Sequence, residues 1–103
     1  MRDLEDDTMR LTKKQLHAIK TNFKSFFHDG DIYLFGSRVD DSKKGGDIDL
    51  YISTINRKAL VHKKIQFLAK LKREIGQQKI DVVLDYGQNR LIDTIAKKDG
   101  ILL

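Results

Sequence analysis

Three aspartates in two short apolar segments are the residues best placed to do chemistry. Asp47 and Asp49 stand two residues apart, and Asp81 lies in a similar apolar run over residues 80–84. Because residues i and i+2 of a strand point to the same side of a sheet, the carboxylates of Asp47 and Asp49 should lie side by side and repel each other. Mg²⁺ would relieve this repulsion, since it binds carboxylate oxygens and keeps positions for water and phosphates. With Asp81 on a neighbouring strand, we expect three catalytic carboxylates that hold two Mg²⁺ ions about 3.5–4 Å apart, an arrangement suited to nucleotidyl transfer.

A second motif lies upstream of these acids, at Gly36, Ser37 and Arg38. A glycine directly after a strand lets the backbone approach a phosphate, to which the Ser37 hydroxyl and nearby N–H groups can donate. Arg38 can neutralise a phosphate oxygen. Taken separately, the glycine-serine pair is typical of an ordinary turn, and the two aspartates are typical of a solvated strand face. Together, they indicate a nucleotide-binding site.

Apolar periodicity predicts the elements that position these residues. We expect helices where apolar residues recur every three or four positions and strands where they alternate or form short buried runs. Val61, Ile65, Leu68, Leu71 and Ile75 should form the buried side of the second helix, and Asn89 should cap the third. The resulting fold class is α/β (α+β): a small mixed β-sheet with helices on one face and the acids on the other. The expected elements are a helix over 12–27, strands over 32–35 and 47–52, a helix over 58–75, a strand over 80–84 and a helix from 89 to 96 or 97.

The composition limits the class of protein. The 103 residues are 40% hydrophobic and 34% charged and contain no cysteine, which predicts one domain over 1–103 and excludes thiolate metal sites and disulfide frameworks. We expect residues 1–10 to be flexible. No apolar run is long enough to span a membrane, and the acidic start argues against a signal peptide, so we expect a cytoplasmic protein without a membrane partner. The net charge of +5 suits an acidic partner. The lysine-rich face of the helix over 58–75 is more typical of a surface that faces solvent or a protein than of one that binds nucleic acid.

The combined pattern resembles the nucleotidyltransferase superfamily related to DNA polymerase β. Its signature is glycine-serine or glycine-glycine, an interval, an Asp-x-Asp pair and a third aspartate on a later strand. Within that superfamily the chain looks like the minimal nucleotidyltransferases, which are antitoxin partners of HEPN-domain toxins. The likeness covers most of the chain, including residues 33–38, both acidic strands and the closing segment 92–103.

The resemblance implies a nucleotidyltransferase fold and a role for each motif residue. Gly36, Ser37 and Arg38 would bind ATP, Asp47 and Asp49 would hold Mg²⁺, and Asp81 would complete the metal site and help to deprotonate the acceptor. We expect Asp85, on the same strand face, to be structural or to lie at the rim.

The implied activity is AMPylation: transfer of AMP from ATP to a tyrosine of a HEPN toxin, as part of a toxin-antitoxin system. Two alternatives stay open. One is nucleotidyl transfer to a small hydroxylated molecule, with a helical partner subunit. The other is a non-catalytic nucleotide-binding module that neutralises its partner by binding alone.

Overall fold

The computed structural model describes residues 11–36, 47–76 and 78–103. The predicted flexibility of residues 1–10 lies outside this part of the chain, as do the predicted roles of Ser37 and Arg38. The elements of the described residues are α1 (Lys13–Phe27), β1 (Asp31–Phe35), β2 (Ile48–Ser53), α2 (Leu60–Ile75), β3 (Ile80–Leu84), α3 (Leu91–Asp99) and β4 (Ile101–Leu102).

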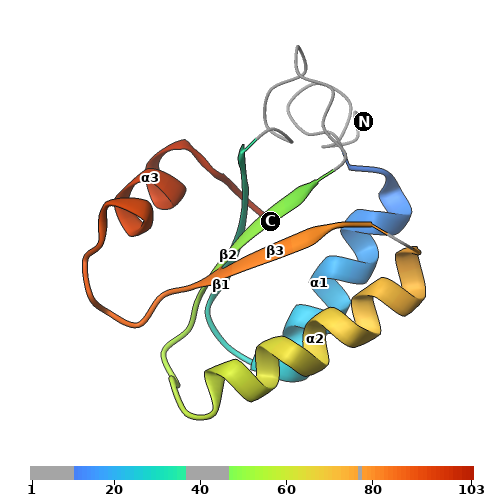
Figure 1. Ribbon diagram of the computed structural model, residues 1–103, viewed down its shortest axis with the longest axis horizontal. Coiled ribbons are helices and arrows are strands. Elements are labelled where there is room, and N and C mark those ends of the chain that lie inside the picture. The colour runs from blue at the N-terminus through green and yellow to red at the C-terminus, as the bar shows by residue number, and fades with distance from the viewer. Residues whose placement is uncertain (1–10, 37–46, 77) are drawn as a thin grey trace.

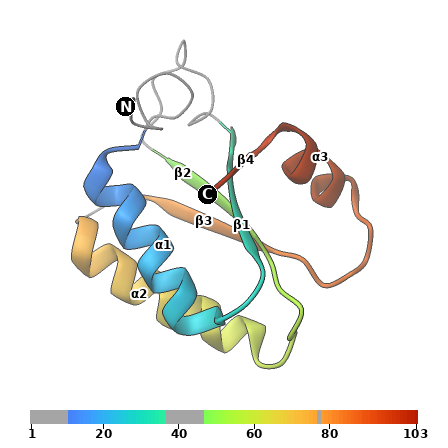
Figure 2. The same ribbon diagram turned by 180° about the vertical axis from the view of Figure 1, so that it is seen from behind.

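The four strands form one mixed sheet in the order β3-β2-β1-β4. β1 runs antiparallel to both β2 and β4, whereas β2 and β3 are parallel and pair along the whole of β3. Figures 1 and 2 show α1 and α2 side by side across the sheet, with α3 well apart from them in both views. The predicted mixed sheet with packed helices is thus confirmed.

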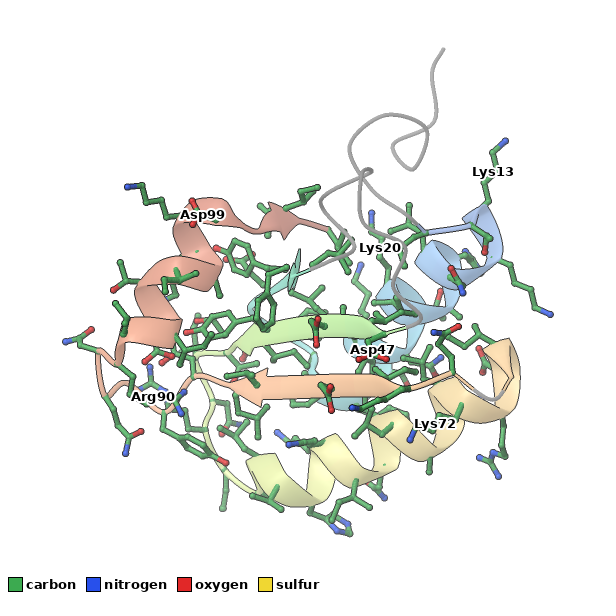
Figure 3. All side chains as sticks on the ribbon, turned by 45° about the horizontal axis from the view of Figure 1, so that its top comes forward. Lys13, Lys20, Asp47, Lys72, Arg90 and Asp99 are labelled. Atoms are coloured by element: carbon green, nitrogen blue, oxygen red, sulfur yellow. The ribbon has the colours of Figure 1, made fainter. Side chains whose placement is uncertain are left out.

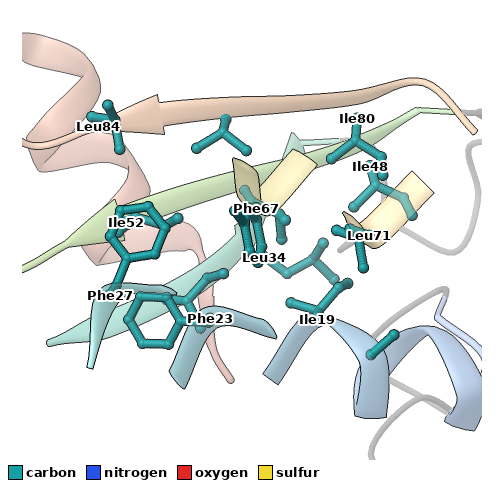
Figure 4. Packing of buried hydrophobic residues seen from close by; sticks show 14 of the residues in the cluster. Ile19, Phe23, Phe27, Leu34, Ile48, Ile52, Phe67, Leu71, Ile80 and Leu84 are labelled. Atoms are coloured by element: carbon teal, nitrogen blue, oxygen red, sulfur yellow. The ribbon is translucent and has the colours of Figure 1, made fainter. Parts of the chain in front are cut away.

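The core lies between the sheet and the two helices α1 and α2. Every second residue of the strands points to this side of the sheet, and these residues are aliphatic. Phe27 and Phe67 meet edge to face at its centre, with ring centroids 5.9 Å apart. Figure 4 shows strand residues packed on the helix aromatics. The buried strand residues on this face are Ile32, Leu34, Ile48, Leu50, Ile52, Ile80, Val82 and Leu84. Burying this face directs the alternate residues of β2 and β3, including the aspartates, to the opposite side.

Helix boundaries follow local capping. Thr12 caps α1 through a reciprocal pair of hydrogen bonds with Gln15, each 3.0 Å long. α3 is capped by Arg90 rather than by Asn89, so that part of the prediction is wrong. Asn89 instead adopts a positive φ of 53° in the preceding turn.

The buried side of α2 is partly as predicted, because Leu71 lies in the core and Leu68 and Ile75 pack against it. Leu60, Phe67 and Leu71 face the core. Val61 and Ile65, in contrast, are 57% and 60% exposed. α1 packs against the other flank of α2, where the Asn22 side-chain amide donates to the Glu74 carboxylate at 3.1 Å. This contact is one of those that hold α1 against α2.

α3 departs from the expected arrangement of helices on one face. Asp93 of α3 accepts a hydrogen bond from the Tyr51 hydroxyl, and Tyr51 projects on the same side of β2 as Asp49. α3 therefore lies over the side of the sheet that α1 and α2 leave free. β4, which the sequence analysis did not anticipate, follows directly and pairs with β1. No helix of the described residues is long and apolar enough to cross a membrane.

Candidate active site

Asp49 and Asp81 are directly opposite each other on neighbouring strands. The parallel register of β2 and β3 pairs Asp49 with Asp81 and brings both side chains to the face turned away from α1 and α2. Asp49 is half-buried and Asp81 is exposed. The predicted convergence of two strands on one acidic site is confirmed for this pair.

Asp47 stands just before β2, and Figure 3 shows it beside the start of that strand, far from Asp99. One of its carboxylate oxygens lies 3.8 Å from the Lys79 amine. Lys79 is two residues before Asp81, and its carbonyl accepts from the Ile48 N–H at 2.9 Å. Lys79 was missed by the sequence analysis, although its spacing from Asp81 is the same i, i+2 relation that joins Asp47 and Asp49.

Gly36 comes against the Asp49 carboxylate at the end of β1. Phe35 pairs with Asp49 across the antiparallel ladder, so the next residue reaches the acidic side chain. Gly36 has a positive φ of 78°, and a side chain there would clash with the Asp49 carboxylate. Backbone conformation and space therefore both require glycine. The predicted proximity of the glycine turn to the aspartates is seen for Gly36.

The electrostatics of the site are those of crowded like charges. Partial burial, followed by the negative charges of Asp81 and Asp47, raises the pKa of the Asp49 carboxyl above its ordinary value, while Lys79 opposes the shift. The charges of Asp81 and Asp47 therefore both act on Asp49, and Lys79 compensates for them in part. A further cation would relieve the repulsion that remains.

The donor chemistry of these residues suits a hard divalent cation, because carboxylate oxygens are the protein ligands that Mg²⁺ prefers. Asp49 and Asp81 are the pair best placed to hold such an ion, with Asp47 next to them. In the described part of the chain, no group of three acidic or histidine side chains is already arranged closely enough to hold a metal ion together. The two-ion site at Asp47, Asp49 and Asp81 stays a prediction.

The other end of the same sheet face is occupied by a closed polar network under α3. The Tyr51 hydroxyl donates to Asp93 at 2.7 Å, and the Arg90 guanidinium grips both Asp93 oxygens at 3.0 and 3.1 Å. Hydrogen bonds from Arg90 outweigh burial and lower the pKa of the Asp93 carboxyl to about 2. Burial, assisted by the hydrogen bond to Asp93, raises the pKa of the Tyr51 hydroxyl. These groups hold α3 to the sheet.

Asp85 belongs to this network. Its buried carboxylate accepts from the Ser53 hydroxyl at 3.0 Å, the Gly87 N–H at 2.7 Å and the Lys97 amine at 3.1 Å. Burial alone would raise the pKa of the Asp85 carboxyl, but these donors together lower it. Asp85 is thus a structural residue that joins the end of β3 to α3.

Comparison with known protein families adds to this geometry. The model of a nucleotidyltransferase domain matches residues 13–102, which is most of the chain and includes every element described above. The chain belongs to the nucleotidyltransferase domain family. No curated protein matches it significantly. For this nucleotidyltransferase domain, the family supports nucleotidyl transfer as the general activity and agrees with the mixed sheet that the sequence predicted.

Proposed function

We propose that this nucleotidyltransferase domain transfers AMP from ATP to a hydroxyl group, and that the acceptor is a tyrosine of a cognate HEPN toxin. The observation that carries the proposal is the in-register pair of Asp49 and Asp81 on the open face of the sheet, with Gly36 against Asp49. Mg²⁺ bound there would supply the positive charge that activates the attacking oxygen and stabilises the leaving pyrophosphate.

The residues of the chain have separable tasks in this proposal. Gly36 lets the backbone come close to the phosphates, and Ser37 and Arg38 donate to them. The three aspartates Asp47, Asp49 and Asp81 supply oxygen ligands for Mg²⁺, and Lys79 limits the repulsion among them. Asp81 accepts the proton of the acceptor hydroxyl, for which its exposure on β3 gives access from outside the sheet.

A protein acceptor is supported by the position of Asp81. Among the described residues β3 is a terminal strand of the sheet, and Asp81 is exposed on it. A tyrosine on the surface of another protein can therefore approach Asp81 without entering a cavity. A partner that supplies the other wall of the site would exclude water from the reacting groups. In this role, the protein would act as an antitoxin.

The decisive experiment is the mass of the purified HEPN toxin after incubation with this protein, ATP and Mg²⁺. We expect one or more adenylyl groups on a tyrosine with the wild type and none with Asp81→Asn. Asp99→Asn is the matched control, because it removes an exposed carboxylate at the far end of α3, remote from Asp47 in Figure 3.

The same experiment separates the alternatives. A toxin that is neutralised without any gain in mass, and equally well by Asp81→Asn, would show a binding module instead of a transferase. Release of pyrophosphate from ATP only when a small hydroxylated compound is added would place the acceptor among small molecules. Either result would contradict the proposed protein acceptor.

A further inference from the structure

A cavity of about 420 Å³ lies on the opposite side of the sheet from the aspartates, between α1 and the strand β4. Phe23 of α1, Ile32 of β1 and Leu103 give it an apolar floor. Phe23 and Ile32 are themselves buried in the core, so packing holds this part of the floor in place, whereas Leu103 is half-buried. We call this cavity and its rim the α1–β4 groove.

The rim of the α1–β4 groove is mainly basic. Lys20 and Lys24 stand one helical turn apart on α1 and line the groove together with His28. Asp31 is the acid in its lining. Lys20 and Lys24 are exposed, and neither forms an ion pair with any residue in the described ranges. The two lysines are thus available to an anionic ligand.

The exposed edge of β4 also borders the groove. The Leu103 N–H donates to the Ile32 carbonyl at 2.8 Å, and thus points toward β1. In an antiparallel ladder, the backbone N–H and C=O groups of adjacent residues point in opposite directions. Those of Leu102 therefore face away from β1, at the rim of the groove. Leu102 is 56% exposed, and within the described part of the sheet β4 has a neighbour on one side only. This backbone can pair with an extended chain.

We propose that the α1–β4 groove binds an extended acidic peptide segment of a partner protein. The segment pairs with Leu102 at the edge of β4, places an apolar side chain on Phe23 and Leu103, and directs carboxylates to Lys20 and Lys24. Strand addition of this kind takes its affinity from backbone hydrogen bonds and its specificity from the side-chain pocket. The site is independent of the nucleotidyl transfer proposed above, because it uses the opposite face of the sheet.

Charge complementarity and the backbone edge favour a peptide over other anions. An amphipathic small molecule would use the apolar floor and the lysines but would leave the outward N–H and C=O of Leu102 unused. An extended chain satisfies all three features, because its side chains alternate between the groove and solvent.

The test measures fluorescence anisotropy of a short labelled peptide of alternating glutamate and leucine, added to the intact protein. We expect saturable binding that weakens as salt is raised, since screening reduces the attraction of exposed charges. A matched peptide with lysine in place of glutamate should not bind. Amide signals of Leu102 and Leu103 in NMR spectra should shift on addition of the acidic peptide.

The variants locate the binding. The double substitution Lys20→Glu/Lys24→Glu should weaken binding of the acidic peptide at least about tenfold, because the attraction between each lysine and the peptide becomes a repulsion. The control Lys72→Glu/Arg73→Glu makes the same change of net charge on α2, away from the groove, and should leave affinity nearly unchanged. A third variant, Thr21→Trp, adds bulk at the exposed rim and should weaken binding without any change of charge.

Three outcomes would overturn the proposal. One is equal binding of the glutamate and lysine peptides, which would remove the role of the rim lysines. Another is equal loss of affinity in the groove and control variants, which would show attraction by net charge alone. The third is saturable binding of decanoate in the groove with no binding of the acidic peptide at millimolar concentration, which would assign the groove to small amphipathic acids.

Discussion

The open half and the α3-covered half of one sheet face use the same residue type in opposite ways. In the open half, like charges and partial burial raise the pKa of Asp49. In the covered half, Arg90, Tyr51 and neighbouring donors lower the pKa of Asp93 and make it part of the structure. Carboxylates that already accept strong hydrogen bonds stabilise the fold, whereas carboxylates that repel one another favour the binding of an added cation.

Asp49→Asn is expected to separate activity from stability. Transfer of labelled AMP should fall by more than about a hundredfold, since even the partners that orient metal ligands are worth 10–100-fold. The midpoint of thermal unfolding without divalent cations should rise, because the substitution removes a charge that repels Asp81 and Asp47. Unchanged transfer would remove Asp49 from the mechanism, and a lower midpoint would contradict the repulsion.

Asp93→Ala should show the reverse pattern. It leaves the buried Tyr51 hydroxyl without its acceptor and the Arg90 guanidinium without its bidentate partner. We expect a loss of about 2 kcal/mol in the free energy of unfolding by urea, less than for a fully buried ion pair because Arg90 is partly exposed. Asp99→Asn is the control and should change little. A loss no larger than that of the control would refute the structural role of Asp93.

The contrast between these halves was only partly predictable from sequence. Strand alternation sufficed to place Asp49 and Asp81 on one face, because burial of Ile80, Val82 and Leu84 leaves the intervening residue no other direction. It could not show what covers Tyr51. That depends on α3, which is joined to Tyr51 by a hydrogen bond between residues 42 positions apart.

The error in the first half of α2, where Val61 and Ile65 are exposed, has a related cause. Apolar residues occupy a wide arc of this helix, from Phe67 and Leu71 round to Val61 and Ile65. Periodicity shows that such an arc exists, but not which side of it meets the sheet. The neighbouring helix decides this, through packing of α1 that includes the contact of Asn22 with Glu74. Lys79 was overlooked for a simpler reason, since the site was sought among the aspartates and the glycine-serine motif and not at the residue that precedes β3.

Divalent cations should stabilise only the open half. Mg²⁺ is expected to raise the thermal midpoint of the wild type more than that of Asp47→Asn, with a gain on the order of 1 kcal/mol when free Mg²⁺ exceeds its Kd about fivefold. Asp93→Ala, although less stable, should show the same gain as the wild type. Equal gains in the wild type and Asp47→Asn would count against a metal ion at this site.

Acid should affect the two halves with opposite sign. Asp49 has a raised pKa in the folded state, so its ionised form opposes folding at neutral pH, and this cost disappears as pH falls toward the unfolded value of 3.8. The stability advantage of Asp49→Asn over the wild type should therefore shrink on acidification. The folded pKa of Asp93 is about 2, so its contribution to stability is present above the unfolded value of 3.8 and is lost as pH falls through about 2.

Urea unfolding of wild type, Asp49→Asn and Asp93→Asn in metal-free buffers from neutral pH to pH about 2 measures both differences. The gap between wild type and Asp49→Asn should close at higher pH than the gap between wild type and Asp93→Asn. The opposite order would show that the crowded aspartates are not the ones under electrostatic stress.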